Sequence, residues 1–568
     1  MKSSQNHKII NDLIVDQSRA KILKNESSSF LSLELTQRQL CDLELILNGG
    51  FSPLKTFMGQ KDYLSVCKNM RLDDGSLWPI PIYLDISSDF AKKIKIGSKI
   101  ALRDYEGVIL AVITVNEKYK PNPLDEALDI FGTNDELHPG VSYINSKVKP
   151  IYISGPLEGL QLPIHFDFPE LRHTPNELRE LFIKNGWDKI IAFQTRNPMH
   201  RAHVEIASRA AKEVGANILI HPSVGMTKPG DVDHFTRVRT YKAVLSKFDS
   251  SSTTISLLPL AMRMAGPREA LWHAIIRKNY GMTHFIVGRD HAGPGKDKNG
   301  EDFYGPYEAQ ELVDKHAKEL GIDIVHGRTM VYVPSLDKYL RTEEIPKGTS
   351  FANISGTELR ARLVTGDDLP EWFTYPEVAL ELRRSVIVRS KQGFCIFLTG
   401  LSGSGKSTIA NILAIKLLEI GGRQISILDG DLVRKNLSSE LSFSKEHRDL
   451  NIRRIGFVAS EIVKHGGVAI CAPIAPYETP RSDVRHMVTE SGGFILAYVN
   501  TPIEICEARD VKGLYKKARE GKIPNFTGIS DPYEVPLEPE IILDTEKYSA
   551  DELASRVITY VKSLGYIA

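Results

Sequence analysis

The residues best suited to chemistry lie in the segment QTRNPMHRAH, residues 194–203. An apolar run, residues 190–193, ends there in polar and basic side chains, and His200 and His203 follow where a helical pattern begins. A strand that ends in a polar turn and a helix N-terminus is a common phosphate site in α/β sheets. Arg196 is able to clamp a tetrahedral oxyanion through two N–H groups. The segment therefore favours a nucleotide or anion site.

Two alternatives for the histidine pair stay open at this point. Residues three apart share a helix face, so His200 and His203 are able to ligate one metal ion, although no third ligand is evident nearby. A purely structural pair, one histidine packed and one exposed, is the second alternative. The nucleotide interpretation accounts for more of the neighbouring residues at once.

A second cluster, GRDHAGPG at residues 288–295, also follows an apolar run. Lys228, Arg237 and Arg263 lie between the two clusters along the chain. Single surface arginines carry little information, but several at the ends of strands in one domain favour anion binding.

The strongest motif is GLSGSGKS, residues 400–407, which satisfies GxxxxGK[ST] between an apolar strand pattern and a helical one. The glycines let backbone N–H groups converge on phosphate oxygens at the helix N-terminus. Lys406 would reach the β and γ phosphates of ATP, and Ser407 would hold Mg²⁺. The residues expected to bind ATP are Gly400, Gly403, Ser404, Gly405, Lys406, Ser407 and Thr408.

Carboxylates follow the next apolar run, at Asp429 and Asp431. A carboxylate at this edge of an α/β sheet would orient Mg²⁺ or accept a proton from an attacking hydroxyl. Basic residues come later, in 443–459 and in 509–534. On composition alone, such charge-rich stretches are more often solvated faces than sites.

The elements that position these residues divide the chain into four expected domains. Residues 1–168 mix short β-like runs with Gly and Pro turns, which predicts a β-rich domain. Residues 169–325 alternate strand and helix patterns, which predicts a parallel sheet covered by helices. A small connecting domain, 326–390, precedes a second α/β domain at 391–568.

Composition narrows the classes of partner. The 568 residues are 42% hydrophobic and 25% charged with a net charge of +1, which gives no electrostatic reason to expect nucleic acid or an anionic membrane. No apolar run approaches the roughly 20 residues of a membrane span, and the N-terminal residues lack a signal-peptide core. Five separated cysteines favour a reducing compartment. We therefore expect a cytoplasmic protein.

The C-terminal residues 391–568 resemble adenylylsulfate (APS) kinases in GLSGSGKST, LDGDLVR, FSKEHRDLNIRR and NFTGISDPYE. That family transfers phosphate from MgATP to the 3′-hydroxyl of APS. The resemblance implies that Lys406 stabilises transition-state charge and Asp431 is the base. The implied substrate-binding residues are Arg434, Phe443, Arg448, Asn451 and Phe526, the two phenylalanines enclosing the adenine. Ala475 stands where many members have serine, so a phosphoserine intermediate is excluded there.

Residues 20–385 resemble ATP sulfurylases in NGGFSPLKTFM, QTRNPMHRAH, LLPLAMRMAGPRE and GRDHAGPG. That family joins sulfate to the α-phosphoryl group of ATP and releases pyrophosphate. The resemblance implies a PUA-like N-terminal domain and a Rossmann-like nucleotidyltransferase domain. The implied catalytic residues are Thr195, Arg196, Asn197, His200 and His203, and the implied substrate-binding residues are Gln194, Arg196, Gly288, Arg289, Asp290, His291, Ala292 and Val331.

The chemistry of sulfate fits these residue types. Sulfate is already a dianion at neutral pH, so the site needs no general base, only cations and N–H donors that bring two anions together. We therefore expect Arg196, Asn197 and the histidines to lie there without a partnering carboxylate.

Together the halves predict a multidomain α/β enzyme that makes 3′-phosphoadenylylsulfate (PAPS) from sulfate and two ATP. Forming APS is energetically uphill, and its phosphorylation draws the first reaction forward. Mg²⁺ with ATP is the only cofactor expected, and the resemblance implies a homo-oligomer. The alternative is a sulfurylase whose kinase-like domain only binds APS or PAPS as a regulator; the complete P-loop argues against it.

Overall fold

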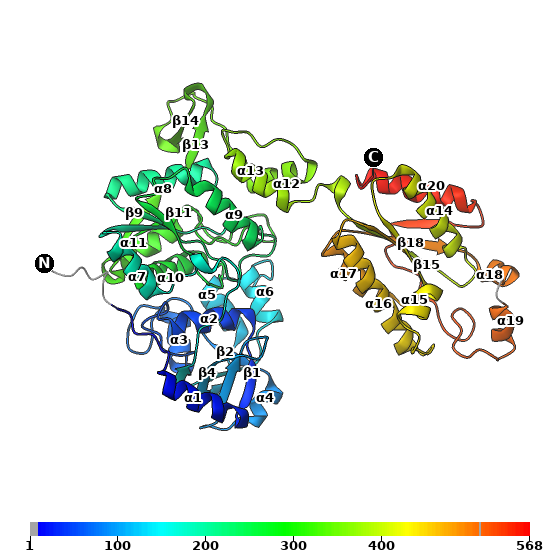
Figure 1. Cartoon of the computed structure of the whole chain (residues 1–568), viewed down its shortest axis with the longest axis horizontal. Coiled ribbons are helices and arrows are strands. Elements are labelled where there is room, and N and C mark those ends of the chain that lie inside the picture. Colours follow the sequence, from blue (N-terminus) through cyan, green and yellow to red (C-terminus); the bar gives the residue numbers. More distant parts are fainter. Residues whose placement is uncertain (1–8, 511–512, 568) are drawn as a thin grey trace. The chain divides into compact units, whose positions relative to one another are not determined.

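The structure is a computed structural model that describes residues 9–510 and 513–567, without the side chain of Asp431. The chain forms two compact units (Figure 1). The first runs to Leu359 and takes up residues 369–385 again; the second comprises residues 360–368 and the chain from Val386 onward. No described helix combines the length and apolar character needed to cross a bilayer.

The N-terminal part of the first unit contains two small sheets. One has the order β1-β3-β4-β7 and the other β2-β6-β5. The strands are β1 (Leu31–Glu34), β2 (Leu84–Ile86), β3 (Lys99–Arg103), β4 (Ile109–Thr114), β5 (Glu117–Tyr119), β6 (Ile151–Ser154) and β7 (Leu157–Gly159). The helices are α1 (Gln17–Glu26), α2 (Gln37–Leu47), α3 (Gln60–Asn69), α4 (Ser88–Lys93), α5 (Pro123–Phe131) and α6 (Pro139–Ser146).

The predicted alternation after residue 169 is confirmed as a five-stranded parallel sheet in the order β10-β9-β8-β11-β12. Figure 1 draws α8 on one face of this sheet and α10 and α11 on the other. The elements are α7 (Pro175–Lys184), β8 (Ile190–Phe193), α8 (Arg201–Val214), β9 (Asn217–Ile220), α9 (His234–Leu245), β10 (Thr253–Ile255), α10 (Gly266–Asn279), β11 (His284–Gly288), α11 (Glu308–Leu320) and β12 (Asp323–Gly327). In the apolar run TISLLPL, residues 254–260, the regular strand β10 ends at Ile255. The backbone nevertheless continues beside the chain that follows β9, because the Ser256 N–H donates to the Ile220 carbonyl oxygen at 3.0 Å and the Leu258 N–H to the Pro222 carbonyl oxygen at 2.9 Å.

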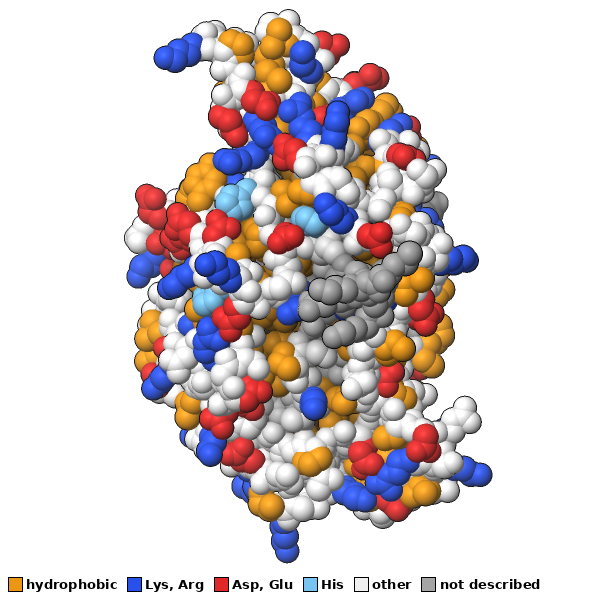
Figure 2. Space-filling view, turned by 90° about the vertical axis from the view of Figure 1, so that its left-hand side faces the viewer, with side chains coloured by type: hydrophobic (Ala, Val, Ile, Leu, Met, Phe, Trp, Pro, Cys, Tyr) orange, Lys and Arg blue, Asp and Glu red, His pale blue; other side chains and the backbone are white. Residues whose placement is uncertain are grey.

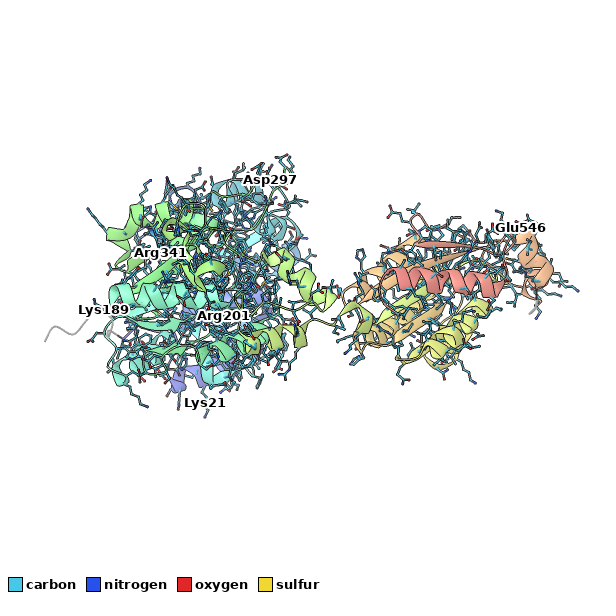
Figure 3. The ribbon with its side chains drawn as sticks, turned by 90° about the horizontal axis from the view of Figure 1, so that it is seen from above. Lys21, Lys189, Arg201, Asp297, Arg341 and Glu546 are labelled. Carbon is cyan, nitrogen blue, oxygen red and sulfur yellow. The ribbon has the colours of Figure 1, made fainter. Side chains whose placement is uncertain are left out.

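Tight packing fixes the edge of this sheet at which β8 ends. All four residues of β8 are buried, and one hydrophobic core joins the N-terminal sheets to the parallel sheet through side chains such as Phe51, Trp78 and Trp272. In Figure 3, Lys189, just before β8, lies at the left-hand edge of the first unit, and Arg201, at the start of α8, lies nearer its middle. Acidic and basic side chains are interspersed over the described part of the face in Figure 2.

The rest of the first unit is a hairpin and the helices that follow it. The hairpin pairs β13 (Met330–Val333) with β14 (Lys338–Arg341). After α12 (Gly356–Thr365), which spans the boundary between the two units, α13 (Pro376–Ser385) packs against α9. Ser355 accepts the backbone N–H of Glu358 at 3.1 Å, as expected for a helix cap.

The second unit is a parallel sheet in the order β16-β17-β15-β18-β19. Helices α14 and α20 cover one face and α16 and α17 the other (Figure 1). The elements are β15 (Phe394–Thr399), α14 (Lys406–Ile420), β16 (Ile425–Asp429), α15 (Gly430–Asn436), α16 (Lys445–Lys464), β17 (Val468–Ala472), α17 (Glu478–Thr489), β18 (Gly493–Asn500), α18 (Ile503–Arg509), α19 (Leu514–Arg519), β19 (Ile541–Asp544) and α20 (Ala550–Ser563).

Two candidate active sites

The turn after β8 is held rigid by its own hydrogen bonds. The backbone N–H of Asn197 donates to Thr195 Oγ1 at 3.1 Å, and that hydroxyl lies 3.0 Å from the Asn197 carbonyl oxygen. The Tyr241 hydroxyl donates to the same carbonyl oxygen at 2.9 Å. Thr195 is buried while the Asn197 side chain is exposed, so the turn presents Asn197 to solvent from a fixed base.

Arg196 joins the two sequence clusters. Its Nη2 donates to the carbonyl oxygen of Gly293 at 3.4 Å, which brings the 194–203 and 288–295 segments to one edge of the sheet. Its Nη1 lies 2.5 Å from Asp231 Oδ1. The expectation of a site without a partnering carboxylate is therefore wrong. Both side chains are mostly buried, and a guanidinium removed from water needs a counter-charge.

The second turn depends on an unusual backbone. Asp290 and Ala292 have φ of 52° and 53°, the left-handed region that few side chains adopt. A Cβ on Gly293 would lie 1.9 Å from Asp290 Oδ1, so any other residue there would displace the Asp290 side chain. Arg289 is exposed and His291 half-buried, and Gly288 closes β11 beside Gly327.

The two histidines of α8 are neutral hydrogen-bonding groups. The backbone N–H of His200 donates to His203 Nδ1 at 3.0 Å, so the His203 proton is on Nε2. His200 Nδ1 lies 2.9 Å from Thr374 Oγ1, and the Phe373 ring packs against its imidazole at 4.4 Å. Burial lowers the pKa of His200 to about 3 and that of His203 to about 4.

The metal interpretation of this pair gains no support. The Nδ1 atoms of both His200 and His203 are engaged within the protein. Within the described ranges, no group of three or more His, Cys, Asp or Glu side chains is suited to holding a metal ion.

The remaining basic residues of this region have separate tasks. Arg263 is buried and places Nη2 2.6 and 2.7 Å from the carboxylate oxygens of Asp42, so it ties the N-terminal part to the parallel sheet. Arg237 is buried and donates to the carbonyl oxygen of Ser223 at 2.9 Å.

Val331 is buried in β13, on a hairpin that packs against α8.

The P-loop of the second unit has the geometry that its motif predicts. Gly400, Gly403 and Gly405 all have positive φ, and Lys406 begins α14. Lys406 Nζ donates to the carbonyl oxygens of Gly400 at 3.0 Å and Leu401 at 2.7 Å, which curls the loop around its ammonium group. Ser404 is buried, while Ser407 and Thr408 are exposed in the first helical turn.

A hydroxyl oxygen and a carboxylate oxygen lie close together beside this loop. Ser407 Oγ donates to Asp429 Oδ2 at 2.7 Å, at the carboxyl end of β16. A hydroxyl and a carboxylate are the hard oxygen ligands that Mg²⁺ prefers, so these residues fit that ion. Asp431 was the expected base; its backbone lies in α15, but its side chain is outside the described part of the structure.

Arg448 of α16 is fixed by a network from the segment 525–531. Its guanidinium donates to Asp531 Oδ2, to the Tyr477 hydroxyl at 2.9 Å and to Thr527 Oγ1 at 3.0 Å. Tyr477 in turn donates to Asp531 Oδ2 at 2.5 Å. One turn along the helix, Asn451 is buried with its Oδ1 unpaired. The structure therefore places Arg448 and Asn451 on one helix face.

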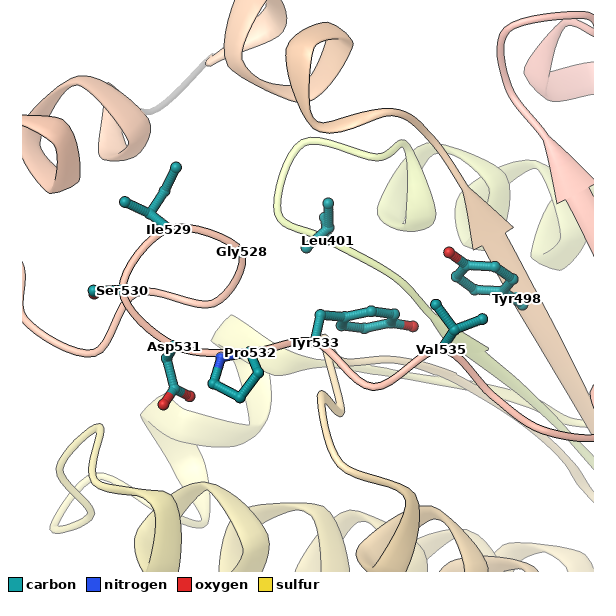
Figure 4. A pocket seen from close by; sticks show the side chains of 9 residues that line it. All are labelled: Leu401, Tyr498, Gly528, Ile529, Ser530, Asp531, Pro532, Tyr533 and Val535. Atoms are coloured by element: carbon teal, nitrogen blue, oxygen red, sulfur yellow. The ribbon is translucent and has the colours of Figure 1, made fainter.

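An open groove of about 600 Å³ runs beside the P-loop (Figure 4). Its lining comprises Leu401, Tyr498, Gly528, Ile529, Ser530, Asp531, Pro532, Tyr533 and Val535. Tyr533 lies with its ring beside Tyr498 in Figure 4, and its hydroxyl is 2.9 Å from Thr399 Oγ1. The groove joins the phosphate loop to the 525–535 segment.

The two phenylalanines expected to enclose an adenine contact different partners in this structure. Phe443 is 65% exposed and lies under the Arg434 guanidinium at 4.2 Å. Phe526 meets Tyr515 edge to face at 5.0 Å. Ala475 is buried with φ of 45°, and its carbonyl oxygen accepts from Arg481 at 2.7 Å, so this position contributes backbone.

Several residues that complete the sites were not identified from the sequence. Asp231, Thr374 and Arg277 contact residues of the first candidate site, and Tyr477 and Asp531 contact Arg448 in the second. Asp531 stands inside NFTGISDPYE, where the motif itself is a signal. Thr374 is 174 residues from His200, and no local pattern marks it.

Comparisons with known proteins cover both units. A PUA-like domain family model matches residues 3–162, an ATP-sulfurylase model residues 169–385, and an adenylylsulphate kinase model residues 392–544. Sulfate adenylyltransferase of Chaetomium globosum is 52% identical over 571 residues, covering 100% of both chains. That of Emericella nidulans is 52% identical over 563 residues, covering 98% of each. A solved structure titled "Hexameric APS kinase from Thiobacillus denitrificans" superimposes with a TM-score of 0.80 at 37% identity, covering 98% of each chain.

Proposed function

This chain belongs to the sulfate adenylyltransferase family, and we propose how its residues divide the two steps of sulfate activation. The enzyme joins sulfate to ATP, releasing pyrophosphate and forming APS, and then phosphorylates APS to PAPS. The observation that supports two active sites is the coexistence of the Arg196–Gly293 contact with a complete P-loop around Lys406.

In the first site, Gln194 and Arg196 bind sulfate together with Ala292. A sulfate oxygen attacks the α-phosphorus of ATP, the new S–O–P bond forms, and the bond to the pyrophosphate oxygen breaks. Because pyrophosphate leaves as an anion, no proton has to be supplied. His203 Nε2–H and the imidazole of His200 donate to the oxygens that gain charge, and their low pKa values keep both neutral.

The two turns hold the nucleotide during this step. Residues 288–291 carry the ATP, and Val331 packs near the adenine. Thr195 and Asn197 keep the anion-binding turn in place, which their mutual hydrogen bonds support. Asp231 orients Arg196 until the substrates share its charge.

In the second site, the P-loop residues bind the phosphates of ATP through backbone N–H groups. Arg448 and Asn451 bind APS, with Arg434, Phe443 and Phe526 around its adenosine. Lys406 moves from loop carbonyls to the transferring phosphoryl group and neutralises its charge. Asp431 accepts the proton of the 3′-hydroxyl.

Ser407 and Asp429 would hold Mg²⁺ bound to ATP. When bound, the ion supplies charge neutralisation on the phosphate oxygens.

The broader setting is part of the same proposal. We assign residues 1–168 to the PUA-like domain, 169–325 to the sulfurylase domain, 326–390 to the connecting domain and 391–568 to the kinase. Five buried cysteines without a disulfide support a reducing, cytoplasmic setting. The hexameric neighbour supports a homo-oligomer. No observation favours the regulatory alternative for the kinase domain.

The first-site assignment is tested by sulfate-dependent pyrophosphate release. Gln194→Ala and Arg196→Ala should each raise KM for sulfate about tenfold or more, because each removes donors to a charged ligand. Lys189→Ala is the matched control, because Lys189 is an exposed cation at the other end of β8. This variant should leave KM for sulfate unchanged. Unchanged KM for sulfate in both site variants would refute the assignment.

A further inference from the structure

Helix α10 buries a polar stripe beneath the first site. Glu269, His273 and Arg277 recur at every fourth position, so they share one helix face, and all three have no solvent-exposed surface. Charged side chains are almost never fully buried unless they are paired. The burial of these three ionisable side chains therefore needs an explanation.

The two members of the stripe nearest the N-terminus of α10, Glu269 and His273, make polar contacts with other residues of the protein. Glu269 accepts the backbone N–H groups of Arg263 at 2.9 Å and Ala265 at 2.8 Å. His273 Nδ1 lies 2.9 Å from His291 Nε2, in the second turn of the site. These two contacts fix the N-terminal end of α10 to the loops around it.

Arg277 is different because it has no carboxylate partner among the described residues. Its Nη2 donates to Gln194 Oε1 and to the carbonyl oxygen of His221 at 3.0 Å. Its Nε and Nη1 are buried without a partner. Burial lowers its pKa to about 9, which still leaves the side chain protonated at neutral pH. A positive charge that no described carboxylate contacts thus lies directly behind Gln194.

This contact decides which way the Gln194 amide faces. A guanidinium only donates, so the amide oxygen must face Arg277. Ser223 Oγ donates to the same oxygen at 3.3 Å. The Gln194 Nε2 is therefore turned away from α10, and its nearest polar contact is Met262 Sδ at 3.9 Å.

We propose that Arg277 is a positioning residue that makes the first site select dianionic oxyanions. It locks Gln194 with its N–H donors toward the anion, and its buried charge attracts a dianion about twice as strongly as a monoanion at the same distance. This inference rests on the proposed role of Gln194 in binding sulfate. An arginine that merely supports the fold would not discriminate between anions of different charge.

Arg277→Met keeps the length of the side chain but removes its charge and its donors. Sulfate-dependent pyrophosphate release should show KM for sulfate raised about tenfold or more, with KM for ATP within about twofold. Inhibition by perchlorate, a tetrahedral monoanion, should weaken less than sulfate binding. An equal loss for sulfate and perchlorate, or no loss for either, would overturn the proposal.

Arg179→Met is the matched control. Arg179 is also buried, and it donates to the carbonyl oxygens of Lys278 and Asn279 at the C-terminal end of α10. This variant should leave the preference for sulfate over perchlorate unchanged. If Arg179→Met lowered the preference for sulfate over perchlorate as much as Arg277→Met does, the effect would come from a general loss of packing and not from the Arg277 charge.

Arg277→Lys keeps the inference testable if the Met variant does not fold. Lysine keeps the charge but loses the fork that grips Gln194, so KM for sulfate should rise while the preference for the dianion persists. Loss of that preference in a folded Lys variant would contradict the charge argument. If Gln194→Ala itself leaves KM for sulfate unchanged, the underlying site assignment fails instead.

Discussion

The two active sites hold their key arginines in opposite ways. In the second, Arg448 meets a carboxylate, two hydroxyls and a backbone carbonyl beside an open groove. In the first, Arg277 is fully buried and lacks a carboxylate partner in the described ranges, whereas Arg196 is paired with Asp231. A buried, uncompensated donor is preorganised for an anion, whereas a compensated one must exchange partners when substrate binds.

The same contrast holds for the residues that we propose as contacts of the phosphate groups. His200 and His203 are neutral and fixed by protein hydrogen bonds. Lys406 is charged and lies against loop carbonyls that ATP would replace. The first site is therefore built for immediate charge stabilisation, and the second for binding coupled to rearrangement.

Lys406→Met gives the largest expected effect and separates the two sites. PAPS formation should fall at least about 10³-fold, because the transferring phosphoryl group loses its main protein cation. Pyrophosphate release from ATP and sulfate should be unchanged. Lys416→Met, on the same helix but paired with Asp551, is the control and should keep both activities. An equal loss of both activities in Lys406→Met would show that the sites are not independent.

His203→Ala tests the other side of the comparison. Sulfate-dependent pyrophosphate release should fall about 10²-fold, as for the loss of one transition-state donor, while the kinase reaction is unaffected. His203→Gln, which restores an N–H near the position of Nε2, should recover part of the rate. His326→Ala, a half-buried histidine beside Asp314, serves as the control. Full activity of His203→Ala would remove the imidazole from the mechanism.

Asp531→Asn tests whether the carboxylate positions Arg448 or competes with the substrate. We expect KM for APS to rise about tenfold, because Arg448 and Tyr477 lose a shared, charged acceptor. Steady-state kinase assays at saturating ATP measure this. Tighter APS binding in the variant would mean that Asp531 opposes the substrate.

Thr374→Val tests how much fixed orientation matters in the first site. It removes the hydroxyl that meets His200 Nδ1 with little change in shape, so the sulfurylase kcat should fall about fivefold, equivalent to one ordinary hydrogen bond. Thr374→Ser should restore the rate. Failure of serine to rescue would point to packing against Phe373 instead.

The smallest effect on activity is expected from pH. Because His200 and His203 titrate near pH 3 and 4, their protonation should not lower the sulfurylase rate between pH 8 and about pH 5.5. Stability should respond: the unfolded histidines take up protons below about pH 6.5 while the folded ones do not. The contribution of these two histidines to the unfolding free energy of the first unit should thus be constant above pH 7 and fall below pH 6.5, by about 1.4 kcal/mol per pH unit for each histidine. An inflection in the rate near pH 6.5 that His203→Gln abolishes would contradict the neutral-donor account.

Most of the fold was predictable from local patterns in the sequence. Apolar runs followed by helical periods predicted both parallel sheets, and GxxxxGKS predicted the loop before α14, because strand, turn and helix are encoded by neighbouring residues. The apolar run at residues 254–260 is only partly regular strand: β10 ends at Ile255, and the rest of the run follows the chain after β9 through separate backbone hydrogen bonds.

The partners of the site residues were not predictable in the same way. Arg196 and Asp231 are 35 residues apart, His200 and Thr374 174, and Gln194 and Arg277 83. Such pairs form because folding brings distant segments of the chain together. A carboxylate that reaches its partner in this way, such as Asp231, is not marked by any pattern in the sequence around it. For that reason the sequence predicted a site without acid, and the folded structure holds one.

The measurement that tests the central claim most directly is PAPS formation from APS and MgATP in the absence of sulfate, followed by ion-exchange chromatography. The enzyme and its His203→Ala variant should both form PAPS with repeated turnover, and Lys406→Met should form none. If APS binds but is not phosphorylated, the second unit is a binding module despite its complete P-loop, and the account of two successive active sites is wrong.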